Sequence, residues 1–121
     1  MLAVTLEDHV RAYPVESVRR REVLNDAIHG RPVVVVFCDS CNVGMAYSAR
    51  QADRELTFEA AGMRDDAEVM RDKDTGTVWT QLSGSALEGP LAGESLEMYG
   101  LESLTFAEYK ERHPGAEILS E

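Results

Sequence analysis

Two cysteines three positions apart, Cys38 and Cys41, are the residues whose type and spacing most directly suggest chemistry. Thiolates are soft metal ligands and redox nucleophiles, so the pair predicts either a metal site or a dithiol that exchanges disulfides. A disulfide that closes so short a loop would constrain little chain entropy. A third interpretation is two small buried residues with no chemical role.

The cysteines follow the strongest predicted strand of the chain, residues 33–37. Four consecutive valines favour a pleated, buried conformation, and a continuous apolar run predicts that both faces are covered. Residues 43–50 alternate with period two, which predicts another strand rather than a helix. This strand–turn–strand setting favours a metal knuckle, with Cys38 and Cys41 as ligands, over a thioredoxin-like pair at a helix N-terminus.

The remaining ligands of such a metal site are not evident from the sequence. There is no second cysteine pair, and the chain has three histidines. We take His113 as a candidate third ligand, with a helix C-cap as its competing role. A methionine such as Met45 or Met70 could bind a soft ion, and the second subunit of a homodimer could supply its own cysteines. Copper, zinc and iron all stay open as the ion.

Four further residues are candidates for a pocket near the thiols. Asp39 stands between the cysteines, whereas Asp72, Trp79 and Gln81 belong to a predicted hairpin around residues 73–76. Trp79 and Gln81 share one strand face, where they could form the wall and a hydrogen-bond donor of a small-molecule site, or belong to the core. The segment that begins at Asp72 superficially resembles the start of a calcium-binding loop. No acid that could bind calcium in a bidentate way follows at the right distance, which favours an Asx-turn.

The pattern as a whole predicts a mainly β (α+β) fold, an antiparallel sheet or partly closed barrel with a C-terminal helix. The length suits a single domain over residues 1–121. Residues 11–14 predict an edge strand, because a proline cannot donate to a ladder, and residues 14–21 could hold a helical turn. Thr105 and Glu108 form a capping box that predicts the start of the C-terminal helix.

The acidic balance limits the classes of partner. The net charge is -10 at pH 7, whereas a protein that binds nucleic acid or an anionic membrane needs a basic face. No apolar run reaches transmembrane length, and the first ten residues do not look like a secretory signal. We therefore expect a cytoplasmic protein whose partner is a small molecule or a metal ion, and whether it is an enzyme stays open.

Several separate segments, in order, resemble one bacterial and archaeal family, domain of unknown function 3179. They are Arg11-Ala12-Tyr13-Pro14, Asn25-Asp26, Pro32 to Cys38 with Cys41, Leu56-Thr57-Phe58, Gly62, residues 72–81, Gly84, residues 89–93 and His113-Pro114. The resemblance covers nearly the whole chain from about Val10. It implies a domain with a Cys-x-x-Cys motif and assigns that motif no activity.

The thiol motif departs from the usual pattern of that family, which reads Cys-Pro-x-Cys-Gly. Here the residues are Cys38-Asp39-Ser40-Cys41-Asn42. Asn42 tolerates a left-handed backbone, so the turn is expected to survive the loss of glycine. Asp39 adds an acid and a candidate oxygen ligand between the thiols.

Overall fold

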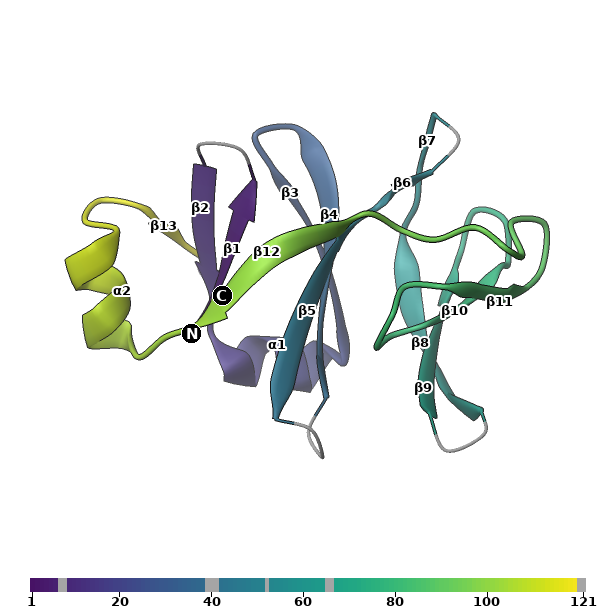
Figure 1. Ribbon diagram of the computed structural model, residues 1–121, viewed down its shortest axis with the longest axis horizontal. Coiled ribbons are helices and arrows are strands. Elements are labelled where there is room, and N and C mark those ends of the chain that lie inside the picture. The colour runs from purple at the N-terminus through teal and green to yellow at the C-terminus, as the bar shows by residue number, and fades with distance from the viewer. Residues whose placement is uncertain (7–8, 39–41, 52, 65–66, 120–121) are drawn as a thin grey trace.

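The protein is mostly β-strand in its computed structural model, which describes residues 1–6, 9–38, 42–51, 53–64 and 67–119 (Figure 1). The elements of this part of the chain are β1 (Leu2–Leu6), β2 (His9–Tyr13), α1 (Val15–Arg21), β3 (Val23–Ile28), β4 (Arg31–Cys38), β5 (Val43–Ser48), β6 (Arg50–Gln51), β7 (Arg54–Glu55), β8 (Phe58–Arg64), β9 (Ala67–Asp72), β10 (Val78–Thr80), β11 (Ala86–Glu88), β12 (Met98–Ser103), α2 (Phe106–Arg112) and β13 (Glu117–Ile118).

These strands form a larger sheet of order β13-β2-β1-β12-β5-β4-β3, a smaller sheet of order β11-β10-β9-β8, and a β6–β7 ribbon. The described strand pairs are antiparallel except that of β13 with β2. Figure 1 shows the larger sheet curled, with α1 at one end of its strands and α2 beside β13. The predicted mainly β fold, a partly closed antiparallel sheet with a C-terminal helix, is confirmed.

Strand β4 lies between β3 and β5 and is covered on both faces, as its run of valines predicts. Val34 and Val36 pack into the core between the two sheets, together with Tyr47 of β5. Val33 and Val35 pack into a second core, which the larger sheet forms with α1. Because side chains alternate along a strand, one apolar segment stabilises both cores.

The prediction that residues 11–14 form an edge strand is wrong. β13 pairs along the outer side of β2 at Arg11 and Ala12, so β2 is an interior strand there. Pro14 lies beyond the last residue of β2 and is the N-cap of α1, where its carbonyl accepts from the backbone N–H groups of Ser17 and Val18. A proline suits this position, because the first turn of a helix has no partner for its N–H groups.

The capping box of the C-terminal helix is confirmed. The side chain of Thr105 accepts from the backbone N–H of Glu108, and the Glu108 carboxylate accepts from the backbone N–H of Thr105. The helix buries Tyr109 against Ala3 and Ala12 of the first two strands. Phe106, at the start of the same helix, is half exposed, with the ammonium group of Lys110 over its ring.

Asn25 joins the two sheets at their edges. Its side-chain Nδ2 donates to the carbonyl of Phe58 at 2.8 Å, and its Oδ1 accepts from the N–H of the same residue at 2.8 Å. The amide therefore binds β8 as the backbone of a neighbouring strand would. Strands β3 and β8 are edge strands of their respective sheets, so this contact closes one side of the core between them.

Replacing Asn25 by Ala removes both hydrogen bonds and should lower the free energy of unfolding by about 1–3 kcal/mol, because the two backbone groups of Phe58 lose their partner. Asn25→Asp keeps the acceptor but sets a carboxylate oxygen against the Phe58 carbonyl oxygen, so its loss should be at least as large as that of Asn25→Ala. Urea unfolding followed by circular dichroism measures both variants. Equal stability of the wild type and Asn25→Ala would show that the contact does not hold the sheets together.

Candidate functional site

Cys38 ends β4 and lies opposite Val43, the first residue of β5. Its side chain is partly buried and packs against the core between the two sheets. It is disulfide-bonded, and the one other cysteine of the chain is Cys41. Cys41 and Asp39 lie outside the described residues. Asn42, the next residue, has a φ of 57°, which confirms the expected left-handed backbone.

The described residues do not assemble the metal site considered from the sequence. Within this part of the chain, no group of three or more His, Cys, Asp or Glu side chains could hold a metal ion. His113 is the C-cap of α2, where its backbone N–H donates to the carbonyl of Tyr109 and its ring lies 5.5 Å from the Tyr109 ring. Tyr109 belongs to a different core from the one that Cys38 contacts, so the two candidate ligands are not brought together.

Asp72 and Trp79 form a polar pair inside the protein. Trp79 is fully buried, and its indole N–H donates to Asp72 Oδ2 at 2.9 Å. Asp72 is also fully buried, and its carboxylate accepts from the backbone N–H groups of Thr75 and Gly76 and from the Thr75 hydroxyl. The predicted Asx-turn is therefore confirmed, and its carboxylate holds Trp79 in the core.

Gln81, one of the predicted pocket residues that the structure describes, lines a cavity. Its side chain is buried and donates from Nε2 to the carbonyl of Val69 at 3.3 Å. Its own carbonyl accepts from the buried hydroxyl of Tyr47 at 2.6 Å. These contacts to β9 and β5 fix the position of Gln81 between the two sheets.

The cavity has a volume of about 250 Å³ and opens beside the end of β4. Val23, the first residue of β3, pairs with Val36, so the last two residues of β4 extend beyond the start of β3. The cavity lies at this corner, bordered by the C-terminal end of α1 and by strands β8 and β9. Its lining includes Arg19, Glu22, Phe37, Met63, Glu68 and Gln81.

The cavity combines opposite charges with an apolar wall. Arg19 supplies a guanidinium, Glu22 and Glu68 supply carboxylates, and Phe37 and Met63 are apolar. Sequence reasoning missed all five. Nothing in the pattern could have found them, because the cavity joins residues of α1, β4, β8 and β9 that are up to about fifty positions apart.

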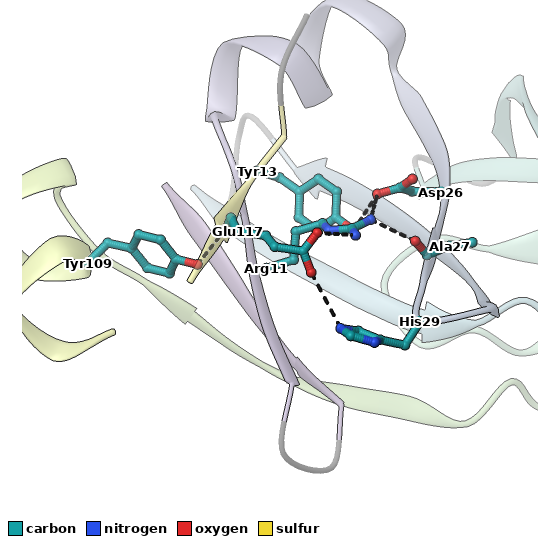
Figure 2. A network of polar contacts seen from close by, with 7 residues as sticks. All are labelled: Arg11, Tyr13, Asp26, Ala27, His29, Tyr109 and Glu117. Atoms are coloured by element: carbon teal, nitrogen blue, oxygen red, sulfur yellow. Dashed lines mark hydrogen bonds and ion pairs between the residues drawn. The ribbon is translucent and has the colours of Figure 1, made fainter. Parts of the chain in front are cut away.

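A second polar cluster, centred on Arg11, joins three strands (Figure 2). Its guanidinium donates to Asp26 at 2.9 Å, to the carbonyl of Ala27 at 2.6 Å and to Glu117 at 2.7 Å. The phenol of Tyr13 donates to the same Asp26 oxygen at 2.8 Å. These contacts tie β2 to β3 and β13, which gives the cluster a structural role.

Burial and the neighbouring charges change the proton affinities in the Arg11 cluster. Burial and the Asp26 carboxylate raise the pKa of Tyr13 above its ordinary value, because both disfavour a phenolate. Burial alone would lower the pKa of Arg11, but its bonds to Asp26 and Glu117 raise it overall. Arg11 in turn lowers the pKa of Glu117. Each group therefore keeps its neutral-pH charge, which holds the contacts together.

A family model described as protein of unknown function, DUF3179, matches residues 1–121. The chain belongs to this family. No curated protein and no solved structure matches it. Three of the segments through which the sequence resembles DUF3179 carry the contacts described above: the Arg11 cluster, the Asn25 bridge and the Asp72–Trp79 pair. None of the described helices is long and apolar enough to cross a membrane.

Tyr47, which holds Gln81 at the cavity, should make the stability depend on alkaline pH. Burial raises the pKa of Tyr47 to about 12, whereas the phenol of an unfolded chain titrates near 10.0. The folded state therefore favours the neutral phenol, and this stability is present below about pH 10 and lost as the pH rises towards 12. Tyr47→Phe should reduce the loss, at a cost of about 1 kcal/mol at pH 7 for the missing hydrogen bond.

Urea unfolding at several pH values between 7 and 12 measures this effect in the wild type, in Tyr47→Phe and in the control Tyr99→Phe, which removes a hydroxyl from a partly buried site. If the free energy of unfolding falls equally with rising pH in the wild type and in Tyr47→Phe, the attribution of this loss to Tyr47 is contradicted.

Proposed function

We propose that this DUF3179 chain is a thiol–disulfide exchange domain in which Cys38 and Cys41 alternate between a disulfide and a dithiol. A thiolate of a reducing partner attacks one sulfur, the protein S–S bond breaks, and the other cysteine leaves as a thiolate that takes up a proton. A second partner thiol then displaces the mixed disulfide. Two electrons and two protons pass from the partner thiols to the protein.

The observation that carries this proposal is the disulfide of Cys38 at the end of a hairpin that is held in register without it. Strands β4 and β5 are already held in register over residues 33–38 and 43–48. With four residues between and including the cysteines, loop closure stabilises the fold by only about 2 kcal/mol. A disulfide so weakly coupled to folding can open without unfolding the domain.

Access to the site also supports exchange. Cys38 is only partly buried, and Val43 opposite it exposes 48% of its surface. The cavity lined by Phe37 adjoins the same end of β4. A thiol can therefore approach this end of the hairpin without any movement of the sheets, as exchange requires.

The proposal includes the cytoplasmic location predicted from the sequence. In a reducing cytosol, disulfides are usually catalytic or redox-sensing, because the thiol pool reduces those without such a role. A small-molecule thiol is the expected partner, in keeping with the acidic chain, for which we predict no nucleic-acid or membrane partner.

The metal-binding hypothesis for Cys38 and Cys41 stays a prediction for the reduced form, with copper, zinc or iron as the ion. A thiolate is the metal ligand, so the disulfide form cannot bind in that way. Within the described residues no group of three His, Cys, Asp or Glu side chains could hold the ion, and a homodimer, a methionine, Asp39 or solvent stay the candidates that would complete the shell.

A redox titration tests the exchange proposal. The protein is equilibrated in dithiothreitol buffers of defined ratio and then alkylated, and the dithiol fraction is read by mass spectrometry. We expect a two-electron midpoint between about -270 and -120 mV at pH 7, the range of exchange proteins. Cys38→Ser is the control and should show no such transition.

A midpoint below about -300 mV would identify a purely structural disulfide and contradict the proposal. The reduced samples are also analysed for copper, zinc and iron. A stoichiometric ion that Cys38→Ser loses would favour the metal hypothesis instead.

A further inference from the structure

We propose that the cavity lined by Gln81 binds a small organic cation, a primary ammonium group on a short hydrocarbon chain. The inference goes beyond the proposed exchange function and does not depend on it, because such binding involves neither cysteine. It rests on three acceptor groups in the lining, those of Glu22, Glu68 and Gln81, and on the apolar surface beside them.

The amide of Gln81 presents a buried acceptor to the cavity. The residue exposes only 5% of its surface, and its Nε2 donates to the Val69 carbonyl at 3.3 Å. Among the described residues no group donates to its Oε1. In this part of the chain, every side-chain nitrogen or oxygen that is shut off from solvent has a hydrogen-bond partner. Gln81 Oε1 is therefore not shut off, and the space that it reaches is the cavity that Gln81 lines.

An open oxygen in a buried amide favours a ligand that donates a hydrogen bond, because buried polar atoms are costly to leave without a partner. The contacts of Gln81 with Val69 and Tyr47 hold the amide in place. A fixed acceptor orients a donor with little loss of side-chain entropy.

Two exposed carboxylates, those of Glu22 and Glu68, favour a donor that is positively charged. Both residues line the cavity, and neither carboxylate bonds to or pairs with another described residue. Their backbones are held in place, since the N–H of Glu22 donates to the Arg19 carbonyl at 3.3 Å and the Glu68 carbonyl accepts from the N–H of Gln81 at 3.1 Å. An ammonium group has three N–H donors and no acceptor, which matches two carboxylates and an amide oxygen.

Arg19, which also lines the cavity, does not reverse this preference. Its guanidinium already donates to Glu16 at 3.0 Å. The two carboxylates of the lining outnumber it, so the lining has a net negative charge. The whole chain carries a net charge of -10, which raises the local concentration of cations.

The size and the apolar part of the cavity select an organic cation over a metal ion. The volume of about 250 Å³ lies below the roughly 300–1,000 Å³ of sites for drug-sized molecules, so it suits a short chain. Phe37, Ala60 and Met63 supply apolar surface for that chain. Ca²⁺ or Mg²⁺ instead needs about six oxygen ligands. No group of three or more His, Cys, Asp or Glu among the described residues could hold a metal ion.

The test uses n-butylammonium as the probe, with 1-butanol and butyrate as comparators of similar size that lack the positive charge. Binding is followed by NMR on isotope-labelled protein, through the side-chain amide of Gln81 and the backbone amides of residues 60–63. We expect saturable shifts of these signals with a dissociation constant of about 1 mM, a reasonable limit for so small a ligand. The comparators should bind at least about ten-fold more weakly, since a charge-assisted hydrogen bond contributes roughly this factor.

Three variants assign the charges. Glu22→Gln and Glu68→Gln should each weaken the binding of n-butylammonium about ten-fold, because each removes a charge-assisted contact. Arg19→Gln removes a like charge and should leave the binding as tight or tighter. The matched control is Glu102→Gln, which makes the same charge change on β12, where Glu102 pairs with Arg112, and it should match the wild type.

Equal binding of 1-butanol would show a hollow that selects only apolar surface, and tighter binding of butyrate would show an anion site. Either result overturns the inference, as does wild-type affinity in both Glu22→Gln and Glu68→Gln. Displacement of n-butylammonium by equimolar Mg²⁺ overturns it in favour of a metal ion, and the absence of saturable binding overturns it outright. The redox midpoint of the disulfide is measured separately, so none of these outcomes decides the proposed exchange function.

Discussion

The Asn25 amide joins the edges of the two sheets beside the core that they share. The Asn25 side chain hydrogen-bonds to both the N–H and the carbonyl of Phe58. These two bonds take the place of backbone pairing between β3 and β8. Buried residues of both sheets, among them Val36 and Trp79, then share one core. Because the bridge fixes β8 against β3, it also fixes the β8–β9 hairpin that borders the cavity.

The candidate site lies where β4 extends beyond the start of β3. β3 starts only after the turn at Glu22, while β4 continues to Cys38. The offset leaves a corner of the sheet without a neighbouring strand, and charged side chains of α1 and β9 face it. A disulfide at such a corner can be reached from solvent, whereas one in the middle of β4 would be enclosed by the two cores.

Local features of the fold could be predicted from the sequence, and long-range ones could not. The buried strand β4, the Asx-turn at Asp72 and the capping box of α2 each follow from residues within a few positions of one another. Strand β12 inserts between β1 and β5, which are distant along the chain, and its Gly100 gives no strand pattern. The pairing of β13 with β2 is also long-range, so the sequence offered only Pro14 as a guide there, and Pro14 predicted an edge strand.

The chemistry of the cysteine pair is likewise not determined by the local sequence alone. A spacing of three positions suits a metal knuckle, a dithiol and a disulfide equally well, and only the environment separates them. Here that environment is a hairpin in fixed register and a nearby cavity that carries both charges, whereas His113 lies beside Tyr109, a residue of another core. Membership of DUF3179 supports the fold assignment and leaves the chemistry to the site itself.

The central claim is that the disulfide of Cys38 opens while the fold persists, and paired denaturation curves test it most directly. Urea unfolding is measured on the oxidised protein and on the protein reduced with dithiothreitol. We predict two cooperative transitions whose free energies of unfolding differ by about 2 kcal/mol or less. Loss of the cooperative transition on reduction, or a difference above about 4 kcal/mol, would show that the disulfide is needed for folding and would contradict the account.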